Sequence, residues 1–244
     1  MGIKLGVFSS HPIQYQVALW RGLAANSELD LQVFYFSDQG VTQGFDPEFG
    51  QEVQWDTPLL EGYDPTFLSR RPIEKLLDFE IADFDALMRR EQFEVVLLHG
   101  YTQKFARQVI CGKKKHGYKV LLRGEFTDSK PAGLDWKKLP RQLYLNWFYS
   151  KVDRFCPIGT EAVKHLERMN VPSDRSHLSP YSVDSEVFEQ TSSSLDKASC
   201  RQQLGVAEDQ TVFLFSGKFI ERKKPLMLAD ALCEIDDDYV TAIF

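Results

Sequence analysis

The sequence predicts an α/β fold built around a doubly wound parallel sheet. Short apolar runs typical of β-strands alternate with helix-length segments at least five times along the chain. These runs are apolar on both faces, which is typical of strands covered by helices on each side of a sheet. The helix-length segments carry apolar residues at helical spacing, so each could return the chain to start another parallel strand. This alternation indicates a Rossmann-like sheet.

The chain before residue 190 supplies most of the predicted sheet. Its expected strands are Ile3–Phe8, Leu29–Phe36, Phe93–Leu98, Tyr118–Leu122, Arg154–Ile158 and Ser176–Ser179. Its expected helices follow Pro12 and Gly159 and cover Ile81–Glu91, Phe105–His116 and Trp136–Tyr149. Pro12 suits the first turn of a helix, because the N–H that it lacks would have no partner there. The stretch from Ser37 to about Leu68, rich in Gly, Asp and Pro, is expected to be loop.

A second β-α-β pattern follows a small polar segment, Thr191–Ser194, which is the best candidate for a linker. Beyond it we expect a helix over Leu195–Leu204, a strand over Thr211–Phe215, a helix over Pro225–Cys233 and a strand over Tyr239–Phe244. The predicted domains are residues 1–190 and residues 191–244. About 50 residues are fewer than the roughly 100 of a doubly wound domain, so we expect a truncated second domain in a longer protein. The alternative is that these strands extend the first sheet.

The composition excludes several classes of protein. The net charge of −6 at pH 7 argues against a surface built to bind nucleic acid. The N-terminus has neither the pattern of a signal peptide nor enough apolar residues to span a membrane. The cysteines form no CxxC pair or other pattern of metal ligands, so we expect reduced thiols, a cytosolic location and no metal. They are Cys111, Cys156, Cys200 and Cys233.

A basic segment stands out in this acidic protein at Gly217–Pro225, with the sequence GKFIERKKP. Lys218 and Lys223 lie five positions apart, and Arg222 and Lys224 add two more cations. The segment leaves a predicted strand and opens a predicted helix, so backbone N–H groups and the positive end of the helix dipole point to the same place. Lysines there would add point charges for a phosphate group. The alternative is a basic turn exposed to solvent.

Further candidate residues follow three strands of the first domain, where ligands of doubly wound sheets bind. They are Ser10, His11, Gln14 and Tyr15 after the first strand, His99 after the third, and Arg123 and Glu125 after the fourth. The first group offers hydrogen bonds to a phosphate or to sugar hydroxyls, and His99 could accept or donate a proton. The alternatives are a helix cap at Ser10, backbone bonding of His99, and a structural salt bridge between Arg123 and Glu125.

Several motifs together resemble the family 4 glycosyltransferases, which are retaining enzymes of the GT-B fold. Ser216–Pro225 resembles the start of the family's C-terminal domain. Ser179–Asp184 is similar to its interdomain segment, although Tyr181-Ser182 stands where the family commonly has Asn-Gly. Ser9–Tyr15 and Phe49–Tyr63 also resemble a branch of this family. The resemblance spans nearly the whole chain and rests on the order and spacing of these motifs.

The resemblance implies a function for the candidate residues. Lys218 and Lys223, with Gly217, would hold the diphosphate of a nucleotide-sugar donor without an obligatory metal or other cofactor. The first domain would bind the acceptor, which is a glycan, a lipid-linked molecule or a small molecule. Many relatives carry a histidine near position 124 or 125, and its absence leaves His99 and Glu125 as candidates for acceptor deprotonation. The implied protein is a cytoplasmic transferase of polysaccharide biosynthesis.

Two other readings of the sequence stay open. One is a non-catalytic sugar- or nucleotide-binding module of the same fold. An α/β dehydrogenase ranks lower, because Ser9–Pro12 stands where Gly-x-Gly-x-x-Gly would follow the first strand. The basic aromatic segment Trp136–Tyr149 suits contact with the inner face of a membrane, its alternative being a core helix with a basic end. We expect this chain alone to be inactive, since the region that holds the base and the donor sugar in the family is missing.

Overall fold

The computed structural model describes residues 2–46, 49–55, 57–126, 139–235 and 240–243. The chain forms two compact units, which are considered one at a time. Unit 1 comprises Met1–Thr42 and Trp55–Val183, and unit 2 comprises Gln43–Gln54 and Asp184–Phe244. The division at Val183 lies seven residues before the end of the predicted first domain at residue 190.

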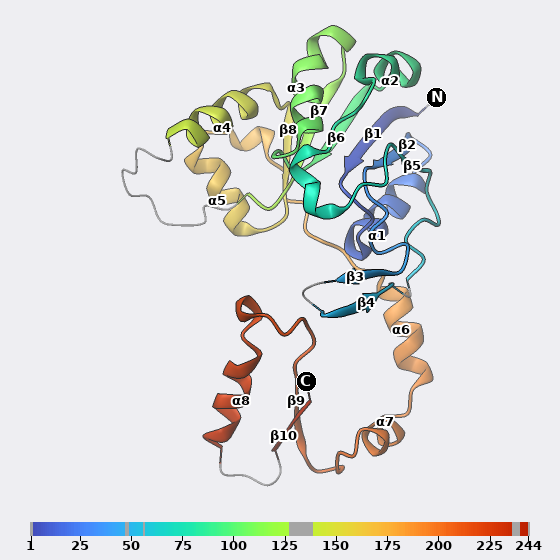
Figure 1. Cartoon of the computed structure of the whole chain (residues 1–244), viewed down its shortest axis with the longest axis vertical. Coiled ribbons are helices and arrows are strands. Elements are labelled where there is room, and N and C mark those ends of the chain that lie inside the picture. The colour runs from blue at the N-terminus through green and yellow to red at the C-terminus, as the bar shows by residue number, and fades with distance from the viewer. Residues whose placement is uncertain (1, 47–48, 56, 127–138, 236–239, 244) are drawn as a thin grey trace. The chain divides into compact units, whose positions relative to one another are not determined.

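A six-stranded parallel sheet forms the centre of unit 1, which confirms the predicted α/β fold (Figure 1). Its strands in spatial order are β5 (Pro65–Phe67), β2 (Leu29–Tyr35), β1 (Ile3–Ser9), β6 (Val95–His99), β7 (Lys119–Gly124) and β8 (Arg154–Pro157). The first strand lies in the interior of the sheet, and the chain builds outward from it on both sides. This order makes the sheet doubly wound.

Helices cover both faces of this sheet, and each face has its own core. The helices of unit 1 are α1 (Gln14–Ala24), α2 (Phe84–Glu91), α3 (Lys104–His116), α4 (Leu139–Lys151) and α5 (Thr160–Arg168). Val17 and Trp20 of α1 belong to the core that contains Val7. The other four helices contribute to the core that contains Phe8. Val7 and Phe8 are adjacent in β1 but lie in different cores, because successive strand residues point to opposite faces.

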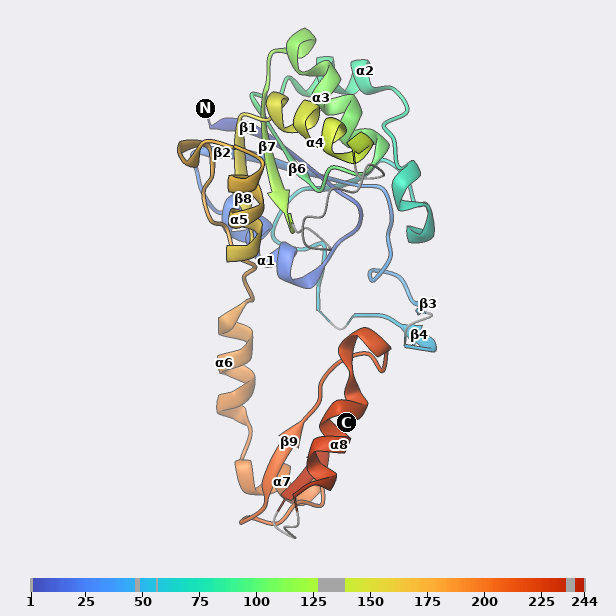
Figure 2. The ribbon, with the colours of Figure 1, turned by 90° about the vertical axis from the view of Figure 1, so that its left-hand side faces the viewer.

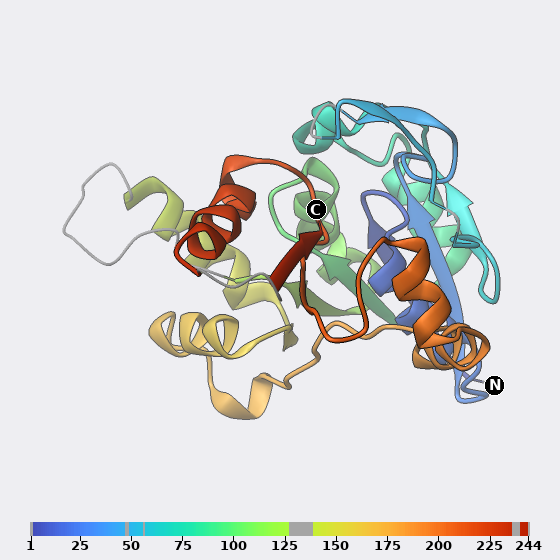
Figure 3. The same ribbon diagram turned by 90° about the horizontal axis from the view of Figure 1, so that it is seen from below.

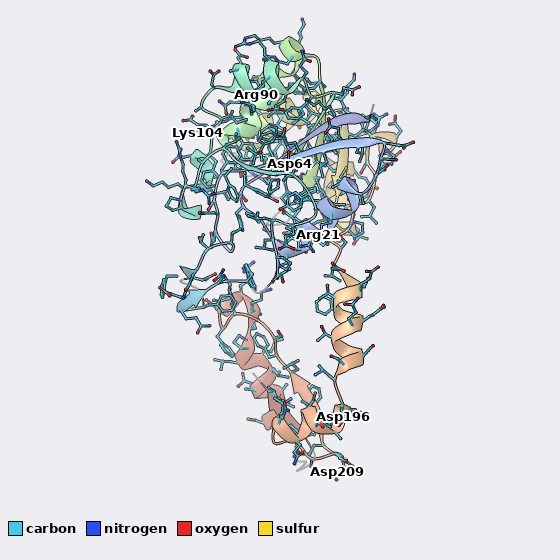
Figure 4. The ribbon with its side chains drawn as sticks, turned by 90° about the vertical axis from the view of Figure 1, so that its right-hand side faces the viewer. Arg21, Asp64, Arg90, Lys104, Asp196 and Asp209 are labelled. Carbon is cyan, nitrogen blue, oxygen red and sulfur yellow. The ribbon has the colours of Figure 1, made fainter. Side chains whose placement is uncertain are left out.

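Unit 2 contains the predicted β-α-β pattern (Figures 2 and 3). Its parallel strands are β9 (Thr211–Leu214) and β10 (Val240–Ile243), with α8 (Pro225–Cys233) between them in the chain. It also holds α6 (Ser185–Ser194), α7 (Lys197–Gln203) and an antiparallel hairpin of β3 (Gly44–Asp46) and β4 (Gln51–Val53). Asp196 lies at the start of α7, where its carboxylate accepts a hydrogen bond from the Ser199 amide at 2.8 Å (Figure 4).

The expectation of a linker at Thr191–Ser194 is wrong, because these residues form the last turns of α6. Their hydroxyl groups donate to backbone carbonyls of the preceding turn. Thr191 Oγ1, for example, donates to the Val187 carbonyl at 2.9 Å. Small hydroxyl residues can therefore end a helix as well as form a flexible linker. The sequence boundary at residue 190 accordingly falls inside this helix.

Other differences from prediction have equally local causes. The helices expected from Ile81 and Leu195 begin later, because aspartates at positions 83 and 196 cap α2 and α7. Ser176–Ser179 forms no strand, although Ser176 makes an isolated bridge beside β8. The expected loop after Ser37 contains β3, β4 and β5, which are three residues each and too short to show a periodic pattern. Trp136, in the predicted basic aromatic helix, lies outside the described residues.

We predict that Gly6→Ala destabilises the protein by roughly 1–3 kcal/mol, because it overpacks the core. A β-carbon at Gly6 would lie 2.9 Å from ring atoms of Phe93, which is itself buried. The matched control is Gly22→Ala on α1, where no atom lies within 4 Å of the added carbon. That change should stabilise the helix by roughly 0.5–1 kcal/mol. Urea unfolding of both variants checks this, and equal shifts in the two would contradict it.

Candidate functional site

Three segments of unit 1 leave the sheet side by side. The parallel register pairs Phe8 of β1 with Leu98 of β6, and His99 of β6 with Arg123 of β7. The residues that follow therefore emerge along one edge, where ligands of doubly wound sheets bind. This edge brings together the predicted residues Ser10, His11, Tyr15, His99, Arg123 and Glu125.

Two histidines at this edge are neutral at pH 7. Burial lowers the pKa of His11 to about 4, and Ser10 Oγ lies 2.9 Å from its Nδ1. Burial also lowers the pKa of His99 to about 4, and the charge of Arg123, like that of His11 once it is protonated, acts in the same direction. Among the described residues, the buried Nδ1 of His99 has no hydrogen-bond partner. Both side chains therefore offer hydrogen bonds rather than charge to a ligand.

Arg123 is almost completely buried, with 1% of its surface exposed. Its Nε lies 3.3 Å from Ser179 Oγ, and its Nη2 donates to the Ser179 carbonyl at 3.2 Å and to the Pro180 carbonyl at 3.0 Å. Burial lowers the pKa of this guanidinium. The structure shows no salt bridge from Arg123 to Glu125 within its described residues, so the alternative of a structural ion pair is wrong. The guanidinium instead holds the segment that follows β8.

Tyr181 joins Arg123 to two other candidate residues. Its ring lies 5.1 Å from the guanidinium carbon of Arg123 and 4.2 Å, between centroids, from the ring of Tyr15. Its hydroxyl donates to the exposed Glu125 carboxylate at 3.3 Å. Burial, together with Tyr15 and the negative charge of Glu125, raises the pKa of Tyr181. No sequence pattern assigns a role to Tyr181, because all three partners lie far away in the chain.

Gln14 points elsewhere along the same surface. Its amide nitrogen lies 3.3 Å from the Thr57 hydroxyl, so this side chain ties the start of α1 to the loop before β5. The neighbouring Gln16 is buried and accepts a hydrogen bond from Ser9 Oγ at 3.0 Å. The described contact of Gln14 therefore lies away from the Tyr15–Tyr181 pair.

In unit 2 the basic loop Gly217–Pro225 connects β9 to α8. Pro225 occupies the first turn of α8 as predicted, and Lys224 before it has a left-handed backbone with φ of 49°. Lys218 Nζ lies 2.8 Å from the Asp46 carboxylate and 4.7 Å from the centroid of the Phe49 ring. Lys223 is exposed on a 3-10 turn, Glu221–Lys223. The two lysines predicted to share one phosphate site thus differ in their surroundings.

Neither a candidate metal centre nor a candidate membrane-spanning helix is found in the described part of the chain. No group of three or more His, Cys, Asp or Glu side chains in it is arranged to hold a metal ion. None of its helices has the length and apolar character needed to cross a membrane.

Comparison with known proteins identifies the fold. The sequence matches no family model and no curated protein. Anabaena HepE, solved in complex with UDP, matches 99% of this chain with a TM-score of 0.62 and 15% identity. A putative UDP-N-acetylglucosamine 2-epimerase from Listeria monocytogenes matches 99% with a TM-score of 0.56 and 10% identity. UDP-GlcNAc 2-epimerase from Neisseria meningitidis, bound to UDP-GlcNAc, matches 98% with a TM-score of 0.54 and 11% identity.

These matches cover 60%, 62% and 64% of the three solved chains, so this chain spans about three fifths of their length. At such low sequence identity, the structural similarity is evidence for a shared fold alone. The protein has an α/β fold of the GT-B, Rossmann-like type, and the match extends over both of its units.

We predict that the two buried histidines lower stability in mild acid. The pKa of each is about 4 in the folded protein and about 6.5 when unfolded. The unfolded chain therefore binds more protons between these values, and the free energy of unfolding falls as the pH drops from 6.5 towards 4. One such histidine accounts for up to about 2 kcal/mol by pH 5.

Urea unfolding at pH 7 and pH 5 measures this loss. His99→Gln should lose less stability than the unmodified protein over this interval, because glutamine takes up no proton. His177→Gln, at an exposed site, is the control and should keep the full loss. An unchanged loss in His99→Gln would contradict the prediction.

Proposed function

We propose that the protein is a retaining glycosyltransferase that moves a sugar from a nucleotide-diphosphate sugar to a glycan, lipid-linked or small-molecule acceptor. The observation that carries the proposal is the basic loop Gly217–Pro225, which joins a strand to a helix that starts with proline. The fold supports it, since Anabaena HepE has a similar fold and was solved with UDP. Neisseria meningitidis UDP-GlcNAc 2-epimerase, bound to UDP-GlcNAc, adds further support.

In this proposal unit 2 binds the donor diphosphate. Lys223 is exposed and free to meet a phosphate, while Lys218 would exchange the Asp46 carboxylate for a phosphate oxygen. Gly217, which precedes Lys218, has no side chain that would stand beside the bound phosphate. The N-terminus of α8 contributes the positive end of its dipole. These charges would stabilise the leaving diphosphate, a role that a metal ion fills in other enzymes.

Unit 1 would bind the acceptor at the carboxyl edge of its sheet. Ser10, His11 and Tyr15 offer hydrogen bonds to sugar hydroxyls there, and Gln14 would contribute from the first turn of α1. Glu125 is the better candidate for accepting the acceptor's proton, because its carboxylate is exposed. His99, neutral at pH 7, would orient the same hydroxyl through a hydrogen bond. Arg123 would act on this site through Tyr181.

The second candidate function is nucleotide-sugar binding without transfer. It is favoured by the low pKa of His11 and His99, both about 4, which makes them weak bases. The Glu125 carboxylate is also already engaged by Tyr181. Binding of a nucleotide sugar by the full-length protein with no turnover would support this function over sugar transfer.

The proposed setting is the cytoplasm, with contact to the inner face of a membrane. Leu139, Leu143 and Trp147 lie four residues apart on α4, so they share one side of the helix, and all are exposed. The exposed Arg141 lies on the other side of the helix, two positions from Leu139 and Leu143. The apolar stripe itself suits contact with a lipid surface or a lipid-linked acceptor.

For the donor site, we predict that Lys223→Ala weakens UDP binding at least about tenfold, by removing a charge-assisted contact to phosphate. Asp46→Asn should strengthen binding, because it removes the carboxylate charge that competes with phosphate for Lys218. Isothermal titration of the full chain with UDP measures both changes. Lys197→Ala, elsewhere in unit 2, is the matched control and should bind normally. Unaltered affinity in Lys223→Ala would rule out the assigned role.

For the acceptor site, we predict that Glu125→Gln, introduced into the full-length protein, lowers the release of UDP from UDP-glucose at least about a hundredfold, as expected for the loss of a general base. Its affinity for UDP should stay the same, since the residue belongs to the other unit. Glu167→Gln, at another exposed carboxylate of unit 1, is the control. A Glu125→Gln protein with full turnover would remove Glu125 from the mechanism.

A further inference from the structure

The chain crosses the carboxyl edge of the unit 1 sheet on its way out of that unit. After β8 it first runs beside that strand, where the His177 amide donates to the Phe155 carbonyl at 2.9 Å and the Ser179 amide to the Pro157 carbonyl at 2.8 Å. For residues 180–183 the described backbone donors make no such bonds to other elements. From Pro180 onward, side chains must therefore hold the segment.

Arg123 provides the first of these contacts. Its guanidinium binds the carbonyls of Ser179 and Pro180 and the Ser179 hydroxyl, at 3.0 to 3.3 Å. Nη2 donates to both carbonyls while Nε faces the hydroxyl, so two nitrogens of one planar group take part, and the single ammonium nitrogen of lysine cannot occupy both positions. The contact thus depends on the shape of the arginine side chain as well as on its charge.

Tyr181 provides the second contact, and it is held from three directions. The Tyr15 ring of α1 packs against it at 4.2 Å, the Arg123 guanidinium carbon lies 5.1 Å from its ring centroid, and its hydroxyl donates to Glu125. The next residues differ, since Ser182 and Val183 are both exposed. Val183 is also the last residue of unit 1.

The energetics of Arg123 support a positional role. Burying a charge is costly unless polar groups compensate for it. Among the described residues, no carboxylate forms an ion pair with Arg123, and its Nη1 has no hydrogen-bond partner. Its described hydrogen bonds all go to two consecutive residues of the exit segment. The cost of this buried charge is therefore offset by contacts that define the path of that segment.

We infer that Arg123 is a positioning residue that fixes the path of the chain out of unit 1, with Tyr181 as the last residue of unit 1 that a described side-chain contact anchors. This inference goes beyond the proposed sugar transfer and does not depend on it. Loss of the anchor frees the segment from Ser179 onward without unfolding the sheet.

Amide hydrogen exchange of the full chain, followed by NMR, tests this inference. Tyr181→Ala removes the ring from a half-buried site, so the fold should persist. It should accelerate exchange of the Ser179 amide at least tenfold and leave the amides of β1 and β6 unchanged. Arg123→Lys should also accelerate exchange of the Ser179 amide at least tenfold, because lysine lacks the planar guanidinium group. Tyr181→Phe keeps the ring contacts and should stay within threefold of the unmodified protein.

Arg21→Gln is the matched control. Arg21 lies on α1 (Figure 4) and ties a different loop, through the carbonyls of Pro58 and Glu61. Its loss should leave Ser179 exchange unaltered. Three results would overturn the inference: unchanged Ser179 exchange in Tyr181→Ala, protection retained in Arg123→Lys, or acceleration spread equally over the amides of the whole sheet.

Discussion

The parallel pairing of β1 with both β2 and β6 is the constraint on which unit 1 depends. It places seven residues of the first strand opposite seven of β2, and four opposite β6. Because all strands of the sheet run in one direction, their carboxyl ends share one edge. His11, His99 and Arg123 meet at that edge, although more than 100 positions separate the first from the last. The chemistry available there follows from strand direction and register.

The sequence was sufficient to predict the parts of the structure that rest on local periodicity. The strands of the main sheet, except the short β5, are apolar runs long enough to recognise, and their alternation with helices implies parallel pairing. The carboxyl-edge rule then points to Ser10, His99 and Arg123 without any knowledge of contacts. Pro225 likewise marks the start of α8, since proline favours the first turn of a helix.

Contacts between distant segments could not be predicted in this way. Cation spacing indicates the loop that contains Lys218, but its partner Asp46 lies 172 positions away. Arg123 was expected at a ligand or beside Glu125, whereas its hydrogen bonds go to Ser179 and Pro180. No local pattern reveals that Tyr181 connects these residues. The small polar composition of Thr191–Ser194 also predicted a linker where the structure has the end of α6. Hydroxyl side chains occur both in linkers and at helix ends, so composition does not distinguish the two.

The hairpin of β3 and β4 lies in the chain between two strands of unit 1 but belongs to unit 2. The polypeptide therefore passes from one unit to the other three times, after Thr42, after Gln54 and after Val183. Neither unit is a continuous stretch of sequence, and no single cut releases both intact. Cleavage after Val183 would leave Lys218 and its partner Asp46 on different polypeptides. One charge of the basic loop, that of Lys218, is thus paired with a residue encoded between two strands of the other unit.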